Sequence, residues 1–377
     1  MQREFEIGPI RPPSEADSLL LRITRNCPWN KCKFCGIYKG SRFSTRSIDE
    51  IKGDIDQVAS MRDDLLSWMA EGDGSEVRRR VYSLPEETGE RYMYVMQWMA
   101  NGEESVFLQD ANTVVLTYDK LHEILTYLRE KLPAVKRVTS YGRVDALAKF
   151  SVEQLTGLKQ AGLDRIHSGY ESGADKVLAL INKGYTKAQE IEAGRKVKAS
   201  GIELSVYFMP GVGGRRLSDE NAIETADVVS KVNPDFVRIR TFVSQPGTEI
   251  MEDINNGLME DCTDIEKMLE LKKMIENIEG ADGYLYSDHI INLLEDVNGN
   301  LSTDKGKMLA VFEAFEKLAP SEQRRYQAAR RMGMVRSLSH MGMLRGDQIN
   351  KIDSHLSKIG SDDEFESFLL RFLRRYI

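Results

Sequence analysis

Cysteine is scarce in this sequence, with only 4 among 377 residues. Three of the four, Cys27, Cys32 and Cys35, fall within nine residues of the chain. This clustering argues against a disulfide framework in a chain of this size and favours a metal site. The fourth, Cys262, has no companion cysteine, so we do not expect an auxiliary cluster. We interpret it as a buried inert thiol, with a substrate thiol or a hydrogen-atom donor as alternatives.

Long apolar runs are missing as well. No stretch of about 18 apolar residues occurs, which excludes a membrane-spanning helix. Residues 1–17 are mixed polar and apolar and contain no continuous signal region. We therefore expect a cytoplasmic protein with no membrane partner.

Basic residues are fewer than acidic residues, which gives a net charge of −7 and a pI near 5.5. This balance disfavours a nucleic-acid binder, which usually carries a basic stripe. Residues 321–377 are the exception, with 11 Lys and Arg against 7 Asp and Glu. We interpret this stretch as a helical extension docked on an acidic body, and a binding arm for an anionic partner is the alternative.

Apolar runs alternate with amphipathic stretches, an order typical of an α/β fold with parallel strands. Six strands are expected, at residues 18–24, 105–109, 137–140, 165–169, 203–209 and 236–242. Six such units predict a partial (β/α)6 TIM-type barrel over residues 18–250, preceded by an N-terminal segment, residues 1–17. The functional site is then expected at the carboxyl ends of the strands.

Two helical parts accompany the predicted barrel. Residues 62–104 are expected to be a helical insertion, and such a long excursion near a site often acts as a lid. Just before it, a helix is expected over residues 47–61, with Ser47 as N-cap and Glu50 three residues on. After the last strand the pattern changes to helices without strands, so residues 251–377 are predicted to be a C-terminal helical extension.

The three clustered cysteines lie on a short loop after the first expected strand. A cubane iron–sulfur cluster takes four ligands, so three protein thiolates leave one iron open to a small molecule. A structural zinc is the alternative, but it needs a fourth ligand and none stands nearby in the sequence. His122 and His167 would complete such a site only if folding brought them there. The pattern therefore favours a cluster with one open iron.

With an aromatic residue, Phe34, before its third cysteine, the loop resembles the motif of radical S-adenosylmethionine enzymes. That superfamily usually has three residues between the first two cysteines, whereas this chain has four, 28–31. The resemblance implies that Cys27, Cys32 and Cys35 bind a [4Fe–4S] cluster whose open iron is chelated by S-adenosylmethionine. It further implies one-electron cleavage of this cofactor to methionine and a 5′-deoxyadenosyl radical, with an external donor such as flavodoxin or ferredoxin. Phe34 would lie against the adenine.

Segments at other strand ends carry the same resemblance. Residues 109–112 stand at the strand end where enzymes of this family bind the methionine amine of the cofactor. Residues 209–214 resemble the glycine-rich turn of the family. By the same resemblance, Glu171 would face the ribose of the cofactor and Lys183 its carboxylate. The cofactor-binding residues that the resemblance implies are Phe34, Gln109, Asp110, Ala111, Ser140, Glu171, Lys183 and Met209.

The resemblance implies an enzyme whose radical acts on an unidentified substrate, which we expect to be a small molecule. The alternatives are radical modification of tRNA or another macromolecule, and a non-catalytic iron–sulfur or zinc protein. The lack of a second cysteine cluster argues against sulfur insertion. No residue is assigned to the chemistry on the substrate. Asp288 and His289 are interpreted as a helix start, with a role in the pocket as the alternative. Residues expected to border the pocket are Tyr141, Arg143 and Tyr207. His167 is expected to share the inward face of its strand with Glu171, either as a donor to cofactor or substrate or as a satisfied core histidine.

Overall fold

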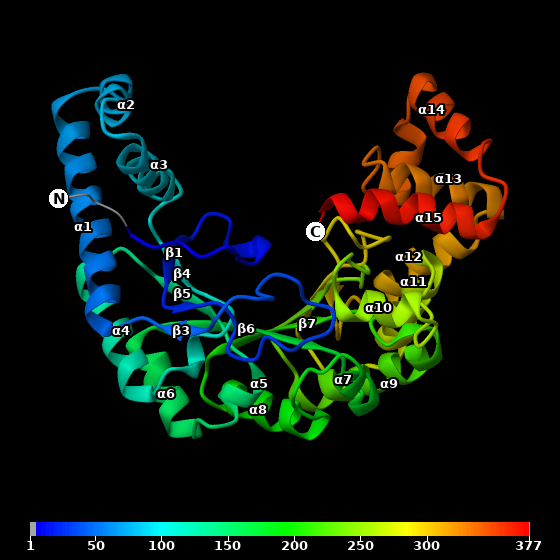
Figure 1. Cartoon of the computed structure of the whole chain (residues 1–377), viewed down its shortest axis with the longest axis horizontal. Coiled ribbons are helices and arrows are strands. Elements are labelled where there is room, and N and C mark those ends of the chain that lie inside the picture. The colour runs from blue at the N-terminus through cyan, green and yellow to red at the C-terminus, as the bar shows by residue number, and fades with distance from the viewer. Residues whose placement is uncertain (1–4, 377) are drawn as a thin grey trace. The chain divides into compact units, whose positions relative to one another are not determined.

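The computed structural model describes residues 5–376 (Figure 1). Its contacts define two compact units that are interleaved along the chain. The first unit comprises the residues up to Asn30, Tyr38–Ser168 and Arg195–Leu204. The second unit comprises Lys31–Ile37, Gly169–Gly194 and the residues from Ser205 onward. The three-part domain division expected from the sequence stays a prediction.

A sheet of eight strands has the order β1-β4-β5-β6-β7-β8-β9-β10. Five pairs of neighbouring strands are parallel: β1 with β4, β4 with β5, β5 with β6, β7 with β8, and β8 with β9. β9 and β10 pair antiparallel. Six of the strands correspond to the six expected from the sequence: β1 (Leu19–Arg22), β4 (Ser105–Gln109), β5 (Arg137–Tyr141), β6 (Leu163–Glu171), β7 (Glu203–Phe208) and β8 (Phe236–Ile239). The predicted α/β class is confirmed.

Two short strands contradict the expectation of helices alone after residue 250. They are β9 (Tyr284–Tyr286) and β10 (Gly299–Asn300). β9 pairs in parallel with β8, with Leu285 opposite Val237. No helix begins at residues 287–289 either, since the chain is irregular there. A strand of two or three residues is too short to produce the alternation by which strands are detected in a sequence.

The cysteine loop begins and ends at a small two-stranded sheet in the first unit. β2 (Thr24–Arg25) lies just before Cys27, and β3 (Ser44–Thr45) lies after Cys35. The two strands are antiparallel, with Thr24 opposite Thr45. This pairing fixes the base of the loop at the end of β1.

The helices of the first unit are α1 (Ile48–Glu71), α2 (Gly74–Tyr82), α3 (Glu86–Ala100), α4 (Tyr118–Lys131), α5 (Val144–Leu147) and α6 (Val152–Ala161). α1 begins as predicted, because Ser47 Oγ accepts a hydrogen bond from the Glu50 backbone N–H at 3.2 Å. Glu50 in turn accepts one from the Ser47 N–H at 2.7 Å. α1 continues past residue 61, since fully buried Leu65 keeps the helical spacing of its apolar face.

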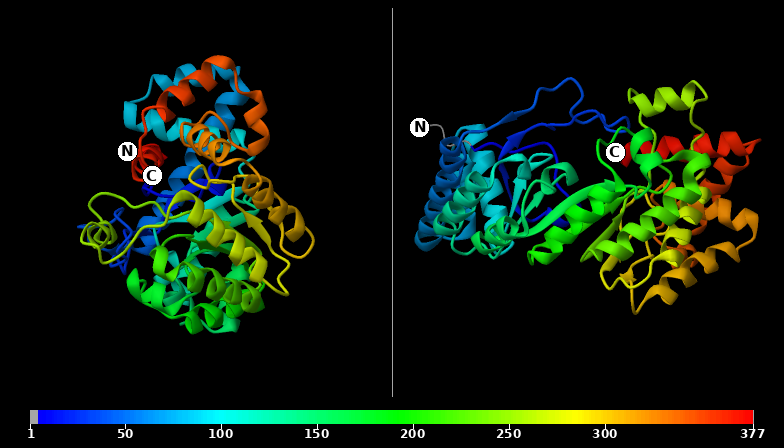
Figure 2. Two further views of the ribbon diagram at one scale, coloured as in Figure 1. Left: turned by 90° about the vertical axis from the view of Figure 1, so that its right-hand side faces the viewer. Right: turned by 90° about the horizontal axis from the view of Figure 1, so that it is seen from below.

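The helices of the second unit are α7 (Asp175–Leu180), α9 (Gly214–Val232), α10 (Glu249–Asn255), α11 (Asp264–Asn277), α12 (Lys305–Glu316), α13 (Pro320–Arg331), α14 (Gly346–Leu356) and α15 (Asp362–Leu373). α8 (Lys187–Ala199) begins in the second unit and ends in the first. Figures 1 and 2 show α13, α14 and α15 gathered together near the C-terminus. Within residues 5–376, no helix is both long and apolar enough to cross a membrane.

The basic residues near the C-terminus are largely paired inside the second unit. Arg330 and Arg331 are each only 1% exposed. Arg331 Nε donates to Asp264 of α11 at 2.9 Å, and Arg330 lies 3.0 Å from Glu295. These buried ion pairs fasten α13 to the rest of the unit, which favours the interpretation of a docked extension.

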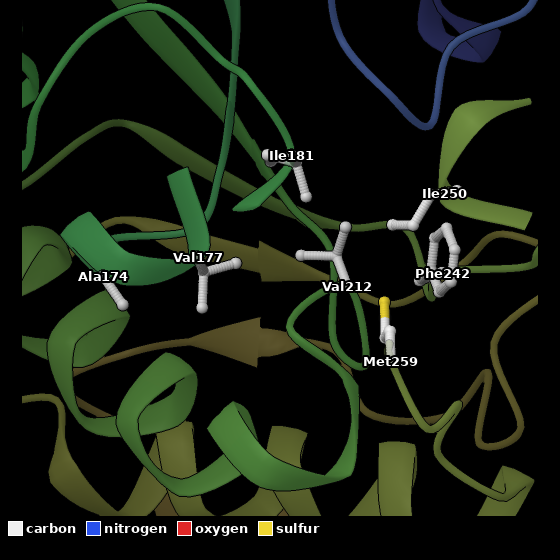
Figure 3. Close-up of a cluster of buried hydrophobic side chains, with 7 residues drawn as sticks. All are labelled: Ala174, Val177, Ile181, Val212, Phe242, Ile250 and Met259. Atoms are coloured by element: carbon white, nitrogen blue, oxygen red, sulfur yellow. The ribbon is translucent and has the colours of Figure 1, made fainter. Parts of the chain in front are cut away.

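A cluster of seven buried apolar side chains lies where several segments of the second unit meet (Figure 3). It contains Ala174, Val177, Ile181, Val212, Phe242, Ile250 and Met259. Phe34 from the cysteine loop and Met209 from the turn after β7 pack against it. The cluster therefore joins residues that the sequence placed at separate parts of one site.

Candidate functional site

The cysteine loop carries thiols without disulfide partners. Cys27 belongs to the first unit, whereas Cys32 and Cys35 belong to the second. Within residues 5–376, no three Cys, His, Asp or Glu side chains converge closely enough to form a ready metal site. The donor set nevertheless suits a cubane cluster with one open iron, because three thiols stand on one loop. Ligation by the three cysteines stays a prediction.

In the first unit, two asparagines shape the start of the loop. Asn26 and Asn30 have φ values of 68° and 47°, a left-handed conformation that asparagine tolerates better than most residues. The Asn30 backbone N–H donates to Cys27 Sγ at 3.4 Å. The Asn30 side-chain amide donates to the Tyr38 carbonyl at 2.6 Å. Hydrogen bonds to cysteine sulfur of this kind tune iron–sulfur clusters.

The ends of β4 and β5 bring Gln109, Asp110, Ala111 and Ser140 to one edge of the sheet, with Leu108 opposite Ser140. Two of these side chains are already engaged with protein groups. Gln109 Oε1 accepts from the Gly8 N–H at 2.7 Å. Asp110, which is fully buried, accepts hydrogen bonds from Arg22, Asn26 and Tyr38. Their roles toward the cofactor stay predictions.

In the second unit, buried Lys183 forms an ion pair with partly buried Glu171, with Lys183 Nζ 2.9 Å from Glu171 Oε1. The same ammonium lies 5.6 Å from the centroid of the Phe34 ring. Glu171 adopts a φ of 69°, a left-handed conformation that costs energy outside glycine and is concentrated at functional sites. A Cβ at Gly169 would stand 2.2 Å from Glu171 Oε1, so a larger residue there would displace this carboxylate.

The part of the loop with Cys32 and Cys35 is tied to the same group. The Lys33 N–H donates to the Ile181 carbonyl at 2.9 Å, and the Lys33 carbonyl accepts from the Ile250 N–H at 3.1 Å. Met209 joins through its N–H, which donates to the Glu171 carbonyl at 2.8 Å. The second unit thus brings together Phe34, Glu171, Lys183 and Met209.

Glu270 of α11 is a site residue that the sequence did not suggest. Its Oε1 accepts from the Gly211 N–H at 2.9 Å and from Asn221 Nδ2 at 2.6 Å. Its Oε2 accepts from the Ser218 hydroxyl at 2.5 Å. Burial raises the pKa of the Glu270 carboxyl to about 7, although these hydrogen bonds oppose the shift. Glu270 therefore holds the glycine-rich turn, where Gly211 has a φ of 86°.

Three other residues considered in the sequence analysis are buried or largely buried by their neighbours. His167 Nε2 lies 3.2 Å from Glu15 Oε1, and both side chains are fully buried in the first unit. Cys262 is 4% exposed, and burial raises the pKa of its thiol to about 12. His289 follows β9, and burial, together with Arg240 and Arg330, lowers its pKa to about 4. His289 is therefore neutral at pH 7.

Glu190 of α8 is an ionisable side chain near Lys183 whose burial the sequence does not predict. It is 0% exposed, and neither carboxylate oxygen has a hydrogen-bond partner among residues 5–376. Burial raises its pKa well above the ordinary value of 4.5, while Lys183 acts in the opposite direction and Glu171 adds to the rise. The Glu190 carboxyl is thus held in its neutral form by its surroundings.

The raised pKa makes Glu190 a source of pH-dependent stability. Above pH 4.5 the folded chain binds more protons at this site than the unfolded chain, so the free energy of unfolding falls as pH rises, by up to about 1.4 kcal/mol per pH unit. Glu190→Gln should remove this contribution and flatten the profile between pH 5 and 8. Denaturant unfolding across that range measures it. Glu192→Gln, on the exposed face of the same helix, should keep the wild-type slope, and equal slopes in all three proteins would contradict the assignment.

Comparison with known protein families identifies the superfamily of this chain. Residues 21–226 match the Radical SAM superfamily, which is just over half of the chain. The chain therefore belongs to the radical SAM superfamily. Enzymes of this superfamily use a [4Fe–4S] cluster and S-adenosylmethionine, and their chemistry requires an electron donor.

Individual relatives match over part of their length. The tRNA-2-methylthio-N(6)-dimethylallyladenosine synthase of Aquifex aeolicus is 26% identical over 180 residues, which are 47% of this chain and 40% of that protein. The 4′-phospho-dehydrooxetanocin synthase of Priestia megaterium is 28% identical over 196 residues, which are 51% of this chain and 23% of that protein. The chain thus spans well under half the length of these two relatives.

Solved structures are similar at a lower level. The archaeal Elp3 of Methanocaldococcus infernus has a TM-score of 0.43 and 15% identity, covering 60% of this chain and 58% of that one. Coproporphyrinogen III oxidase from Escherichia coli has a TM-score of 0.41 and 15% identity, covering 65% of this chain and 48% of that one.

Proposed function

We propose that this chain binds one [4Fe–4S] cluster through Cys27, Cys32 and Cys35 and cleaves S-adenosylmethionine reductively. The bound cluster supplies one electron to the sulfonium, which gives methionine and a 5′-deoxyadenosyl radical. The electron comes from an external one-electron donor, for which flavodoxin or ferredoxin is suitable. The radical then takes a hydrogen atom from a substrate held beside it.

The observation that carries this proposal is the group formed by Phe34, Glu171 and Lys183. Lys183 offers a buried ammonium for the carboxylate of the cofactor, and Glu171 offers acceptor oxygens for its ribose hydroxyls. Phe34 adds an aromatic face for the adenine, one residue before a predicted cluster ligand. Because the side chains of Lys183 and Glu171 are only 7% and 12% exposed, their interactions with a bound cofactor are stronger than they would be in water.

The substrate that we propose is a small molecule. Positioning is the main task of the protein, because a primary alkyl radical attacks whatever lies close to it. The net charge of −7 and the internal pairing of Arg330 and Arg331 leave little support for an anionic polymer as partner. The helices of residues 62–104 and the C-terminal helices are the candidates for selecting the substrate.

Electron paramagnetic resonance of the anaerobically reconstituted, reduced chain tests the proposed open iron. We expect a spectrum of one reduced cubane cluster that changes when S-adenosylmethionine is added, because the cofactor would become a ligand of the open iron. A chain that holds zinc and no iron after reconstitution would contradict the proposal and favour a structural metal protein.

Radical modification of RNA is the second candidate function, and it rests on the names of the curated relatives, several of which are tRNA-2-methylthio-N(6)-dimethylallyladenosine synthases. Binding to a phosphate backbone weakens steeply with salt. We expect the purified chain to retain no RNA when washed at about 200 mM salt. Ultraviolet absorbance and gel analysis of the eluate measure this. RNA that resists the wash in stoichiometric amounts would favour the second candidate.

A further inference from the structure

Asp110 occupies an unusual place at the end of β4. Its carboxylate is fully buried and contacts one residue on each side of the three cysteines. Oδ2 accepts from the backbone N–H of Asn26, the residue before Cys27, at 3.0 Å. Oδ1 accepts from the hydroxyl of Tyr38, which lies three residues after Cys35 and is 3% exposed. The Asp110 carboxylate therefore links the residue before Cys27 to a residue after Cys35.

Arg22 of β1 forms an ion pair with Asp110 in this position. Its Nη2 donates to Asp110 Oδ2 at 2.7 Å, and its Nη1 donates to Glu6 at 3.0 Å. A buried carboxylate persists when it is paired and hydrogen-bonded. Three donors, from Arg22, Asn26 and Tyr38, use most of the roughly four acceptor positions of the Asp110 carboxylate. Its side chain thus faces the residues that flank the three cysteines.

A chain of hydrogen bonds continues from Tyr38 to Cys27. The Tyr38 carbonyl accepts from the Asn30 side-chain amide at 2.6 Å, and the Asn30 backbone N–H donates to Cys27 Sγ at 3.4 Å. Asn30 belongs to the four-residue gap between the first two cysteines, has a φ of 47° and directs its N–H to the sulfur. The longer gap thus provides a donor for this sulfur.

We propose that Asp110, Tyr38 and Asn30 form a positioning frame that fixes Cys27 and its N–H···S hydrogen bond, and so sets the reduction potential and the retention of the cluster. The inference rests on the proposed function, because it assumes that Cys27 is a cluster ligand. Hydrogen bonds to ligand sulfur are among the factors that set cluster potentials. Such a bond stabilises the more negative, reduced form, so its loss lowers the potential. Groups that orient a ligand also govern how tightly the metal is held.

Two substitutions separate the parts of the frame. Tyr38→Phe removes the hydroxyl that donates to Asp110 and keeps the ring. Asn30→Gly removes the side-chain amide and keeps the left-handed backbone accessible, because glycine adopts positive φ without strain. Tyr94→Phe is the matched control, since it too removes a tyrosine hydroxyl that is hydrogen-bonded within the first unit. The Tyr94 hydroxyl donates to the Ser18 carbonyl at 2.9 Å and accepts from the Leu20 N–H at 2.8 Å, away from the cysteines.

The experiment uses the full chain after anaerobic reconstitution, without substrate. It records the midpoint potential of the cluster, its reduced-state magnetic resonance spectrum and the rate of iron release to a chelator. We expect Tyr38→Phe and Asn30→Gly to have a lower potential and an altered spectrum, and to release iron about tenfold faster than wild type. Tyr94→Phe should match wild type in all three readouts even if its melting temperature falls.

Wild-type potential, spectrum and iron release in both folded frame variants would overturn the frame while leaving the proposed function in place. The same changes in Tyr94→Phe would overturn it too, since they would reflect general loosening of the first unit. A wild-type chain that holds no iron would refute the proposed function and the frame with it. Circular dichroism of each variant confirms folding, and Asn30→Gly carries the test if Tyr38→Phe does not fold.

Discussion

Replacing Cys27, Cys32 and Cys35 together with alanine is expected to abolish iron binding and the formation of 5′-deoxyadenosine. Three thiolates are the protein's whole contribution to a cubane cluster with one open iron, and no fourth cysteine stands near the loop to compensate. Wild type should bind about four irons after anaerobic reconstitution and the triple variant close to none. Iron and sulfide analysis, with mass spectrometry of the nucleoside product, measures both effects.

Cys262→Ala is the control for this experiment. Its thiol is 4% exposed, and the rise of its pKa to about 12 on burial keeps it protonated at neutral pH. The variant should therefore keep the cluster and the cleavage reaction. A triple variant that retains the full iron content would show that the ligands lie elsewhere, and loss of iron in Cys262→Ala would make that cysteine one of them.

Lys183→Ala is expected to weaken binding of S-adenosylmethionine by about tenfold to a hundredfold, the range for loss of one hydrogen bond to a charged group. It also leaves the partly buried Glu171 carboxylate without its partner 2.9 Å away, which should lower the free energy of unfolding by up to about 3 kcal/mol, the lower end of the range for a fully buried pair. Anaerobic equilibrium dialysis gives the affinity, and denaturant unfolding gives the stability.

Lys187→Ala separates the two effects of the lysine substitution. Lys187 also forms ion pairs, with Glu224 and Asp227, within the second unit. Its loss should lower stability without changing the affinity for S-adenosylmethionine. If Lys183→Ala lowers stability but leaves that affinity at the wild-type value, the Lys183–Glu171 pair is structural and our assignment of Lys183 to the cofactor is wrong.

Long, regular features of the fold could be predicted from the sequence. Buried parallel strands such as β1 and β4 read as apolar runs between helical patterns, and the Ser47 N-cap is defined by residues three positions apart. β9 and β10 could not be predicted, because strands of three and two residues form only when neighbouring chain supplies their partners. The end of α1 could not be predicted because three charged residues, 62–64, follow Met61 directly in the sequence, although Leu65 continues the buried face of the helix.

The candidate site likewise contains residues that local motifs predict and residues that only the fold reveals. The cysteine loop and the segment with Glu171 have local motifs, so the sequence identified them. Glu270 reads as an exposed acid on an amphipathic helix, and only the fold shows that it accepts a hydrogen bond from Gly211, far away in the chain. The contact of Asp110 with Tyr38 likewise joins residues 72 positions apart. Such partners depend on tertiary structure, which no local spacing encodes.

Cleavage of S-adenosylmethionine by the reconstituted chain tests the central claim most directly. The chain would be incubated anaerobically with S-adenosylmethionine and dithionite, and methionine and 5′-deoxyadenosine would be quantified over time. We predict that the two products form in equal amounts and only when cluster, reductant and cofactor are all present. A chain that holds a reducible four-iron cluster and binds S-adenosylmethionine, yet forms neither product, would contradict the account.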